Sequence, residues 1–133
     1  MAGTLPTSTE YIQQAAHNVA LATFLRANKT ECLDWAATCL FYSAVHYVNA
    51  YLAYSKIPIP RRHRAGDSGQ PGRLNIVQQD ATLRTIYKNY RHLDDESRDA
   101  RYELRRPKVS DYDNFLLIQL KEIQAYILPR ITH

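Results

Sequence analysis

One uncharged segment limits what this chain can fold into more than any other feature. Between Asp34 and Lys56 the sequence has no acidic residue, no lysine or arginine, and no glycine. A helix of this composition has no continuous polar face, so it must pack against other elements on nearly every side. Between Asp34 and Tyr54, the polar residues other than tyrosine are Thr38, Ser43, His46 and Asn49. We therefore expect a buried central helix over residues 34–54, with a narrow polar seam whose members need hydrogen-bond partners.

The same segment is long enough to cross a lipid bilayer, for which about 20 apolar residues suffice. However, it contains four tyrosines in addition to its polar seam, and no basic cluster directly flanks it. Membrane-spanning helices carry few polar groups and are flanked by lysine and arginine on one side. We therefore expect burial inside a helical bundle and no membrane-spanning helix.

Length and composition favour one domain over residues 1–133. The chain has enough material for a single core, and 45% hydrophobic against 23% charged residues is ordinary for a globular protein. Cys32 and Cys39 lie seven residues apart, which is about 10 Å along a helix and too far for a disulfide bond. Because the N-terminus also lacks a signal-like segment, we expect a reducing, cytoplasmic environment.

Capping signals predict the first helix and the start of the central one. Thr7 and Glu10 have the spacing of a capping box, which predicts a helix from this point to about Asn28, after a flexible leader over residues 1–6. Thr30 is a suitable N-cap for the central helix, which is then expected to run about 25 residues to Lys56.

Two charged helices are expected in the second half of the chain. One covers residues 80–93, where Leu83, Ile86, Tyr90 and Leu93 form an apolar stripe. The polar run Asp94–Ser97 breaks this pattern, and a separate short helix is expected over residues 98–105.

A last helix follows Pro107. Ser110 and Asp113 have the spacing of a second capping box, and the helix is expected to run from there to Leu128, with Pro129 ending it. Its expected core stripe is Leu116, Leu120, Ile123 and Ile127. No segment shows the period-two alternation of a strand. The expected fold class is therefore all-α, an up-and-down bundle of four to five helices.

A basic, Pro/Gly-rich loop is expected over residues 57–72, where Pro58 and Pro60 stop the central helix. Residues 61–108 hold twelve Lys/Arg against seven Asp/Glu, whereas the rest of the chain holds five against six. Such a patch attracts nucleic acid, anionic lipid or an acidic protein.

Tyrosines interleaved with these cations favour nucleic acid, because rings stack on bases while cations meet phosphates. The candidate nucleic-acid-binding residues are Arg61, Arg62, Arg64, Arg84, Lys88, Arg91, Arg98, Arg101, Arg105, Tyr87 and Tyr102. An equally good interpretation is that Arg98, Arg101 and Arg105 form ion pairs with acidic neighbours on the same helix.

Two histidines are candidate acid/base residues. His63 and His92 both lie beside arginines, and a proton donor next to guanidinium groups suits phosphodiester cleavage. Arg91, Arg98 and Arg64 are the candidate phosphate-stabilising residues. The alternative is that both histidines are solvated surface groups. His46 is expected to be a hydrogen-bonded core residue, and the alternative is a general base.

No spacing typical of a zinc site, a phosphate-binding loop or a nucleophile elbow occurs. We therefore expect no metal and no cofactor.

Three segments together resemble the HEPN family. They are FYSAVHYVNAYLAYSKIPIP, the basic histidine-containing loop after it, and YKNYRHLDDESRDARYE followed by an amphipathic helix. The resemblance covers roughly Leu33 to Leu128. It implies a small up-and-down helical bundle that forms homodimers and works in toxin–antitoxin or phage-defence systems. Some members of the family are metal-independent endoribonucleases, and others partner a small nucleotidyltransferase.

The resemblance also implies a ribonuclease motif, Arg-x4–6-His, which this chain lacks. Its nearest pair, Arg84 and His92, is separated by seven residues. We therefore predict a HEPN-like module whose basic face binds RNA or a partner protein. The alternative is a metal-independent endoribonuclease with a non-standard site, built from His92 or His63 with Arg91 and Arg98.

Overall fold

The computed structural model describes residues 5–64 and 71–131, and within these ranges all regular structure is helical. The helices are α1 (Ser8–Asn28), α2 (Leu33–Tyr54), α3 (Arg73–Gln79), α4 (Tyr87–Tyr102), α5 (Val109–Asp111) and α6 (Leu117–Ile131). Short 3₁₀ turns cover Thr30–Cys32 and Leu83–Ile86, and a π-helical turn covers Tyr112–Leu116. The expected all-α class is confirmed. Most of the expected leader and the middle of the expected basic loop lie outside the described residues.

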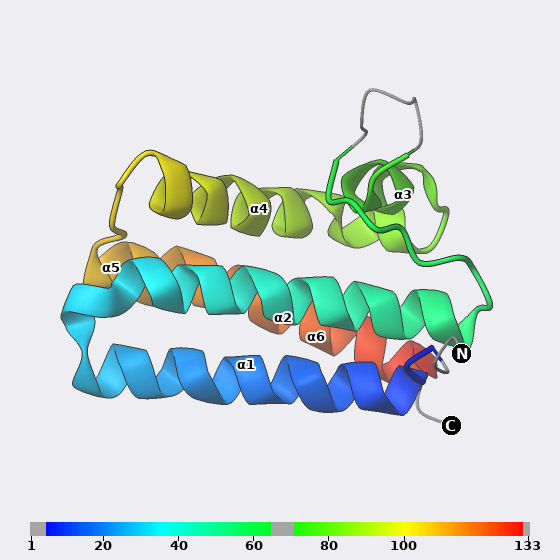
Figure 1. Cartoon of the computed structure of the whole chain (residues 1–133), viewed down its shortest axis with the longest axis horizontal. Helices are drawn as coiled ribbons and strands as arrows, with labels where there is room; N and C mark the ends of the chain where they lie inside the picture. Colours follow the sequence, from blue (N-terminus) through cyan, green and yellow to red (C-terminus); the bar gives the residue numbers. More distant parts are fainter. Residues whose placement is uncertain (1–4, 65–70, 132–133) are drawn as a thin grey trace.

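The four long helices alternate in direction and form an up-and-down bundle (Figure 1). Helix α2 lies between α1 and α4, and α6 lies behind it in this view. Within the described ranges, no helix is both long and apolar enough to span a membrane.

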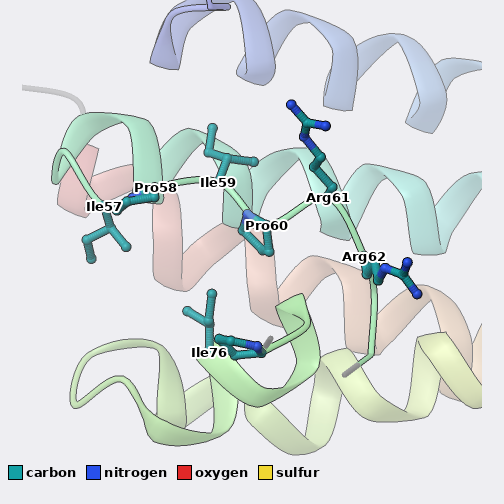
Figure 2. A pocket seen from close by; sticks show the side chains of 8 residues that line it. Ile57, Pro58, Ile59, Pro60, Arg61, Arg62 and Ile76 are labelled. Carbon is teal, nitrogen blue, oxygen red and sulfur yellow. The ribbon is translucent and has the colours of Figure 1, made fainter. Parts of the chain in front are cut away.

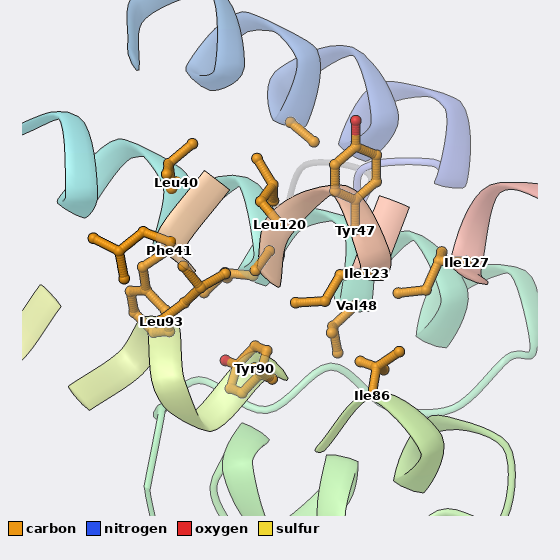
Figure 3. Close-up of a cluster of buried hydrophobic side chains, with 14 of the residues drawn as sticks. Leu40, Phe41, Tyr47, Val48, Ile86, Tyr90, Leu93, Leu120, Ile123 and Ile127 are labelled. Carbon is orange, nitrogen blue, oxygen red and sulfur yellow. The ribbon is translucent and has the colours of Figure 1, made fainter. Parts of the chain in front are cut away.

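The core forms where α2 meets α4 and α6 (Figure 3). The expected apolar stripes are confirmed, because Leu83, Ile86, Tyr90 and Leu93 are all buried, as are Leu116, Leu120, Ile123 and Ile127. On α2, Leu40, Phe41 and Val48 are fully buried. Each large apolar side chain removed from water in this way contributes about 1.5–3 kcal/mol to folding. The uncharged segment is therefore the centre of the bundle, as expected.

The capping box at Thr7 is confirmed, but the predicted start of the central helix at Thr30 is wrong. The Thr7 amide donates to Glu10 Oε1 at 3.0 Å, and the Glu10 amide donates to Thr7 Oγ1 at 3.2 Å. Thr30 does not cap the central helix. It begins a 3₁₀ turn closed by the Cys32 amide on the Lys29 carbonyl at 2.8 Å, so α2 starts only at Leu33.

Helix α4 continues through the polar run that was expected to break it, so residues 87–102 form one helix. The break was expected because Asp94 and Ser97 are poor interior helix residues. Both side chains instead turn into the protein, where Asp94 is 1% exposed and Ser97 is fully buried. Asp94 pairs with Arg64 at 3.2 Å, a partner distant in sequence.

The expected limits of the last helix are also wrong. Ser110 lies inside the short turn α5, and Asp113 pairs with Arg26 through two bonds of 2.8 Å instead of capping. At the other end, Pro129 lies inside α6, which continues to the buried Ile131. Arg130 Nη1 donates to the Tyr126 carbonyl at 2.6 Å. The carbonyl that loses its helical donor at Pro129 is that of Ala125.

Candidate functional site

The segment over residues 57–64, which we call the strap, leaves the end of α2 and crosses toward α3 (Figure 1). Arg73, at the start of α3, holds it in place and is only 5% exposed. Its Nε donates to Asn49 Oδ1 at 2.9 Å, its Nη2 donates to the Pro60 carbonyl at 2.8 Å, and its Nη1 lies 2.9 Å from His63 Nδ1. Asn49, a member of the polar seam of α2, thus finds its partner in the strap anchor.

His63 lies half-buried against the rings of Phe41 and Tyr42, with centroid separations of 5.2 and 5.6 Å. A guanidinium group only donates, so Nδ1 of His63 must accept from Arg73 and the ring proton must be on Nε2. Burial, together with the charges of Arg73, Arg101 and Arg98, lowers the pKa of His63 to about 4. At neutral pH this histidine is uncharged and its lone pair is occupied.

Arg64 ties the end of the strap to α4. Its guanidinium lies 3.2 Å from the buried Asp94 carboxylate and 2.8 Å from that of Asp95. Burial raises the pKa of Asp94, and the charge of Arg64 opposes that shift. Because two carboxylates share this guanidinium, Arg64 is a structural residue more than a free phosphate ligand.

The other candidate acid/base residue lies elsewhere. The His92 ring packs against Phe115 at a centroid separation of 5.0 Å, on the flank of α4 that faces the start of α6. His63 packs against α2 instead, so the two histidines do not share a site. Arg91 lies 3.7 Å from Asp95.

The remaining predicted cations divide between different surfaces. Arg105 lies 3.4 Å from Asp99 and, with the exposed Arg106, borders a hollow next to Phe115. The exposed residues Arg84 and Lys88 and the partly buried Tyr87 lie near the start of α4. Arg98 and Arg101 lie toward the strap side of α4, where their charges act on His63.

A groove runs along the side of α2 that faces outward between α1 and α4. Its floor is a stripe of five α2 residues that covers roughly 100° of the helix circumference. These residues are Trp35, Thr38, Cys39, Tyr42 and His46. We call this feature the α2 groove.

Three adjoining hollows make up the α2 groove. The first, of 480 Å³, lies between α1 and His46. The middle hollow, of 410 Å³, is bordered by Asn18, His46 and the rest of the α2 stripe. The third, of 350 Å³, shares Trp35 and Thr38 with the middle one and reaches Arg101 on α4. The first and middle hollows share His46 as a wall, and the middle and third share Trp35 and Thr38, so the three lie in a row along α2.

Aromatic rings and arginines meet at the α4 end of the groove. Arg101 Nη1 donates to the Tyr42 hydroxyl at 2.7 Å, and its guanidinium carbon lies 5.6 Å from the Tyr42 ring and 5.2 Å from the Tyr102 ring. Trp35 is 59% exposed and Tyr102 is 70% exposed. Arg98 is also exposed, about one turn before Arg101. This end of the groove offers ring faces and positive charge together.

The strap adds two exposed arginines. Arg61 and Arg62 border a separate 640 Å³ hollow between the strap and Ile76, and in Figure 2 Arg61 points away from Ile76. His63, the next residue in the strap, contacts Tyr42 on the groove floor.

Sequence reasoning singled out Arg98, Arg101 and Tyr102 but missed Trp35, Tyr42 and Arg73. The spacing of Trp35, Tyr42 and His46 places them on one helix face. That signal was hidden because the whole segment looked buried. Arg73 carried no local signal at all, since its partners lie far away in the sequence.

Comparison with known proteins found no matching family model, no matching curated protein and no matching solved structure.

Proposed function

We propose that this chain is a helical RNA-binding module, of the kind that its HEPN resemblance implies, and that the α2 groove holds single-stranded RNA. The observation that carries the proposal is the meeting of exposed rings with Arg101 at one end of the groove, with the exposed Arg98 about one helical turn away. Unpaired bases stack on exposed rings, and arginines contact the phosphates between them.

Two further features support single-stranded RNA. The floor of the groove from Trp35 to His46 is roughly 16 Å long, from eleven steps of 1.5 Å along a helix, which suits a few nucleotides. Arg61 and Arg62 in the adjoining strap extend the positive charge beyond the groove. The HEPN resemblance favours RNA over DNA.

The geometry supports binding better than catalysis. The His63 lone pair faces Arg73, and His92 packs on Phe115 at the other flank of α4. This arrangement therefore does not favour acid/base catalysis by either histidine on a phosphate held by Arg98 and Arg101. The resemblance further implies that the chain forms a homodimer and can partner a nucleotidyltransferase-like protein. It also implies a role in a toxin–antitoxin or defence system.

The experiment that tests the proposal is a salt titration of RNA affinity. Fluorescence anisotropy with a labelled single-stranded RNA gives the dissociation constant at several salt concentrations. In the variant Arg98→Gln/Arg101→Gln, the slope of log affinity against log salt should become shallower by about 1.4, the value for two lost phosphate contacts to a single strand.

The matched control is Arg105→Gln/Arg106→Gln, which removes the same charge on the flank next to Phe115. This variant should keep the wild-type slope. Equal losses in the two variants would mean that only net charge matters and would contradict a defined groove. Absence of salt-dependent binding by the wild type would contradict RNA binding altogether.

A further inference from the structure

The third hollow of the α2 groove has walls of very different chemistry. It has a volume of 350 Å³ and lies between the start of α2 and the end of α4. Its lining residues are Asp34, Trp35, Thr38, Ala100, Arg101 and Leu104. The ring of Trp35 is 59% exposed, so it is open to a ligand. A flat ring, an apolar surface, a carboxylate and a guanidinium therefore border one hollow.

Asp34 and Arg101 carry opposite charges at this hollow but do not pair with each other. Among the residues that the structure describes, neither side chain forms an ion pair. Asp34 Oδ1 accepts from the Trp35 amide at 2.9 Å, and Arg101 Nη1 donates to the Tyr42 hydroxyl at 2.7 Å. A carboxylate has about four acceptor sites and a guanidinium has several donors, so both groups can bind a further partner. A single ligand can use the two groups at two different places.

The separation of these two groups suits one nucleotide. Tyr42, which holds the Arg101 guanidinium, lies seven residues after Trp35, about 10 Å along the axis of α2. Asp34 lies on the other side of Trp35 in the sequence. In a nucleotide the phosphate hangs from the sugar, on the side away from the Watson–Crick edge of the base. A base stacked on Trp35 can therefore turn this edge toward Asp34 while its phosphate lies toward Arg101.

Leu104 is an exposed leucine on a strained backbone at the border of the same hollow. Its φ is 54°, in the left-handed region, and 90% of its surface is exposed. Residues other than glycine rarely adopt this conformation, and such positions cluster at ligand sites. This side chain contributes nothing to the core, but it can contact a ring that enters the hollow.

We propose that the third hollow binds a guanine of the RNA, stacked on Trp35, with its N1–H and its N2 amino group donating to the Asp34 carboxylate. Guanine is the only one of the four bases with two adjacent donors on its Watson–Crick edge, and a carboxylate accepts two such bonds side by side. Adenine and cytosine have an acceptor nitrogen beside their amino group, and uracil has its donor between two carbonyl oxygens. This inference rests on the proposed function, since it names the base that the groove prefers.

Trp35 makes the test direct, because it is the only tryptophan in the chain. The 5′-monophosphates of guanosine, inosine and adenosine are titrated into the full chain while Trp35 emission is followed, with excitation at the red edge of the indole band. The three ligands carry the same phosphate, and the inosine nucleotide differs from the guanosine nucleotide only in lacking the N2 amino group. The guanosine nucleotide should quench Trp35 saturably. The inosine nucleotide should bind about tenfold more weakly, as expected for one lost hydrogen bond to a charged group, and the adenosine nucleotide more weakly still.

The variant Asp34→Asn tests the assigned contact. It keeps an acceptor for the Trp35 amide but replaces one carboxylate oxygen with an amide group that donates. The preference for the guanosine over the adenosine nucleotide should fall by about tenfold. The matched control is Glu31→Gln, which removes the same charge from an exposed side chain that does not border the hollow, and it should keep the wild-type preference. The comparison of the guanosine and inosine nucleotides needs no variant, so it decides the matter if Asp34→Asn does not fold.

The outcomes separate this inference from the proposed function. Equal affinities for the three nucleotides, absence of quenching, or equal effects of the Asp34 and Glu31 variants would each overturn the guanine site. RNA binding would still stand if the salt slope depends on Arg98 and Arg101. If the guanosine nucleotide is selected through Asp34 but RNA affinity does not depend on those arginines, RNA binding through the groove fails and the guanine site stands.

Discussion

Arg73 is a buried cation whose three side-chain hydrogen-bond partners are neutral. It bonds to the amide of Asn49, the ring of His63 and the carbonyl of Pro60, so one side chain joins α2, α3 and the strap. A buried hydrogen bond contributes modestly when it is made, but a buried polar group left without its partner costs much more. Together with two backbone bonds of 2.8 Å, from the Arg73 amide to the Arg62 carbonyl and from the Leu74 amide to the His63 carbonyl, this side chain holds the strap in place.

Replacing Arg73 with methionine keeps the aliphatic stem but removes all three bonds. We expect Arg73→Met to lower the free energy of unfolding by about 2–3 kcal/mol, because the buried Asn49 amide and the His63 ring lose their donor. Urea denaturation followed by circular dichroism measures this change. Arg62→Met, the same substitution at an exposed strap position, should change the value by less than about 0.5 kcal/mol. Equal effects would contradict the anchoring role.

His63 gives the fold a pH dependence with a defined sign. Its pKa is about 4 in the folded chain and near 6.5 when the chain is unfolded. Between these values the unfolded state binds more protons, so stability rises with pH. The contribution of His63 is complete above about pH 6.5 and is lost as the pH falls toward 4.

His63→Asn tests this dependence, since an asparagine oxygen can replace Nδ1 as the acceptor for Arg73 but does not titrate. We expect the melting temperature of the variant to fall less than that of the wild type when the pH is lowered from about 6.5 to about 4. The control is His17→Asn, at an exposed position of α1, which should keep the wild-type profile. A wild-type profile in His63→Asn would contradict the assigned shift in pKa.

At the scale of the helices, the sequence predicted periodic features well and boundaries less well. The apolar stripes of α4 and α6 repeat at helical spacing, and the box at Thr7 uses only neighbours, so both are visible locally. The helix break predicted at Asp94 was wrong because the partner of this carboxylate, Arg64, is thirty residues away in the sequence. The helix end predicted at Pro129 was wrong because Ile131, beyond it, is buried and holds the last turn in place.

The end of α2 shows a local strain that no periodicity reveals. The Ile57 amide donates to the Leu52 carbonyl at 2.8 Å, and the Lys56 amide donates to the Ala53 carbonyl at 3.2 Å, which together form a Schellman motif. This motif needs a left-handed residue at its centre, and Lys56 has φ of 58°. The helix therefore ends before Pro58 and Pro60, which were expected to stop it.

Lys56→Gly should relieve this strain. A left-handed conformation costs an ordinary residue about 1–2 kcal/mol, of which glycine's greater chain entropy recovers part. We therefore expect the variant to be more stable by about 0.5–1 kcal/mol, measured as a higher melting temperature. Lys29→Gly is the control, since Lys29 ends α1 with φ of −141°, where glycine has no such advantage. That change should leave stability unchanged or lower it.

At the scale of the whole molecule, the packing of the bundle explains why the sequence predicted only part of the candidate site. The basic residues Arg98 and Arg101 were evident from composition. The floor of the α2 groove was not, because the uncharged segment was expected to be packed on nearly every side. Helix α2 is indeed buried for most of its surface, but α1 and α4 leave one stripe open, and Trp35 on that stripe is 59% exposed.

The whole bundle also determines whether the histidines can cleave RNA. We expect a labelled single-stranded RNA to stay full length when incubated with the wild-type chain, both with magnesium and with EDTA. The physical reason is that His63 has its lone pair on Arg73, while His92 lies at Phe115. General acid/base catalysis needs a histidine within hydrogen-bond reach of the reacting group.

Cleavage by the wild type that disappears in His92→Ala but persists in His17→Ala would contradict this expectation. It would indicate a ribonuclease site completed by a second copy of the chain, and sedimentation at the same protein concentration would then have to show a dimer.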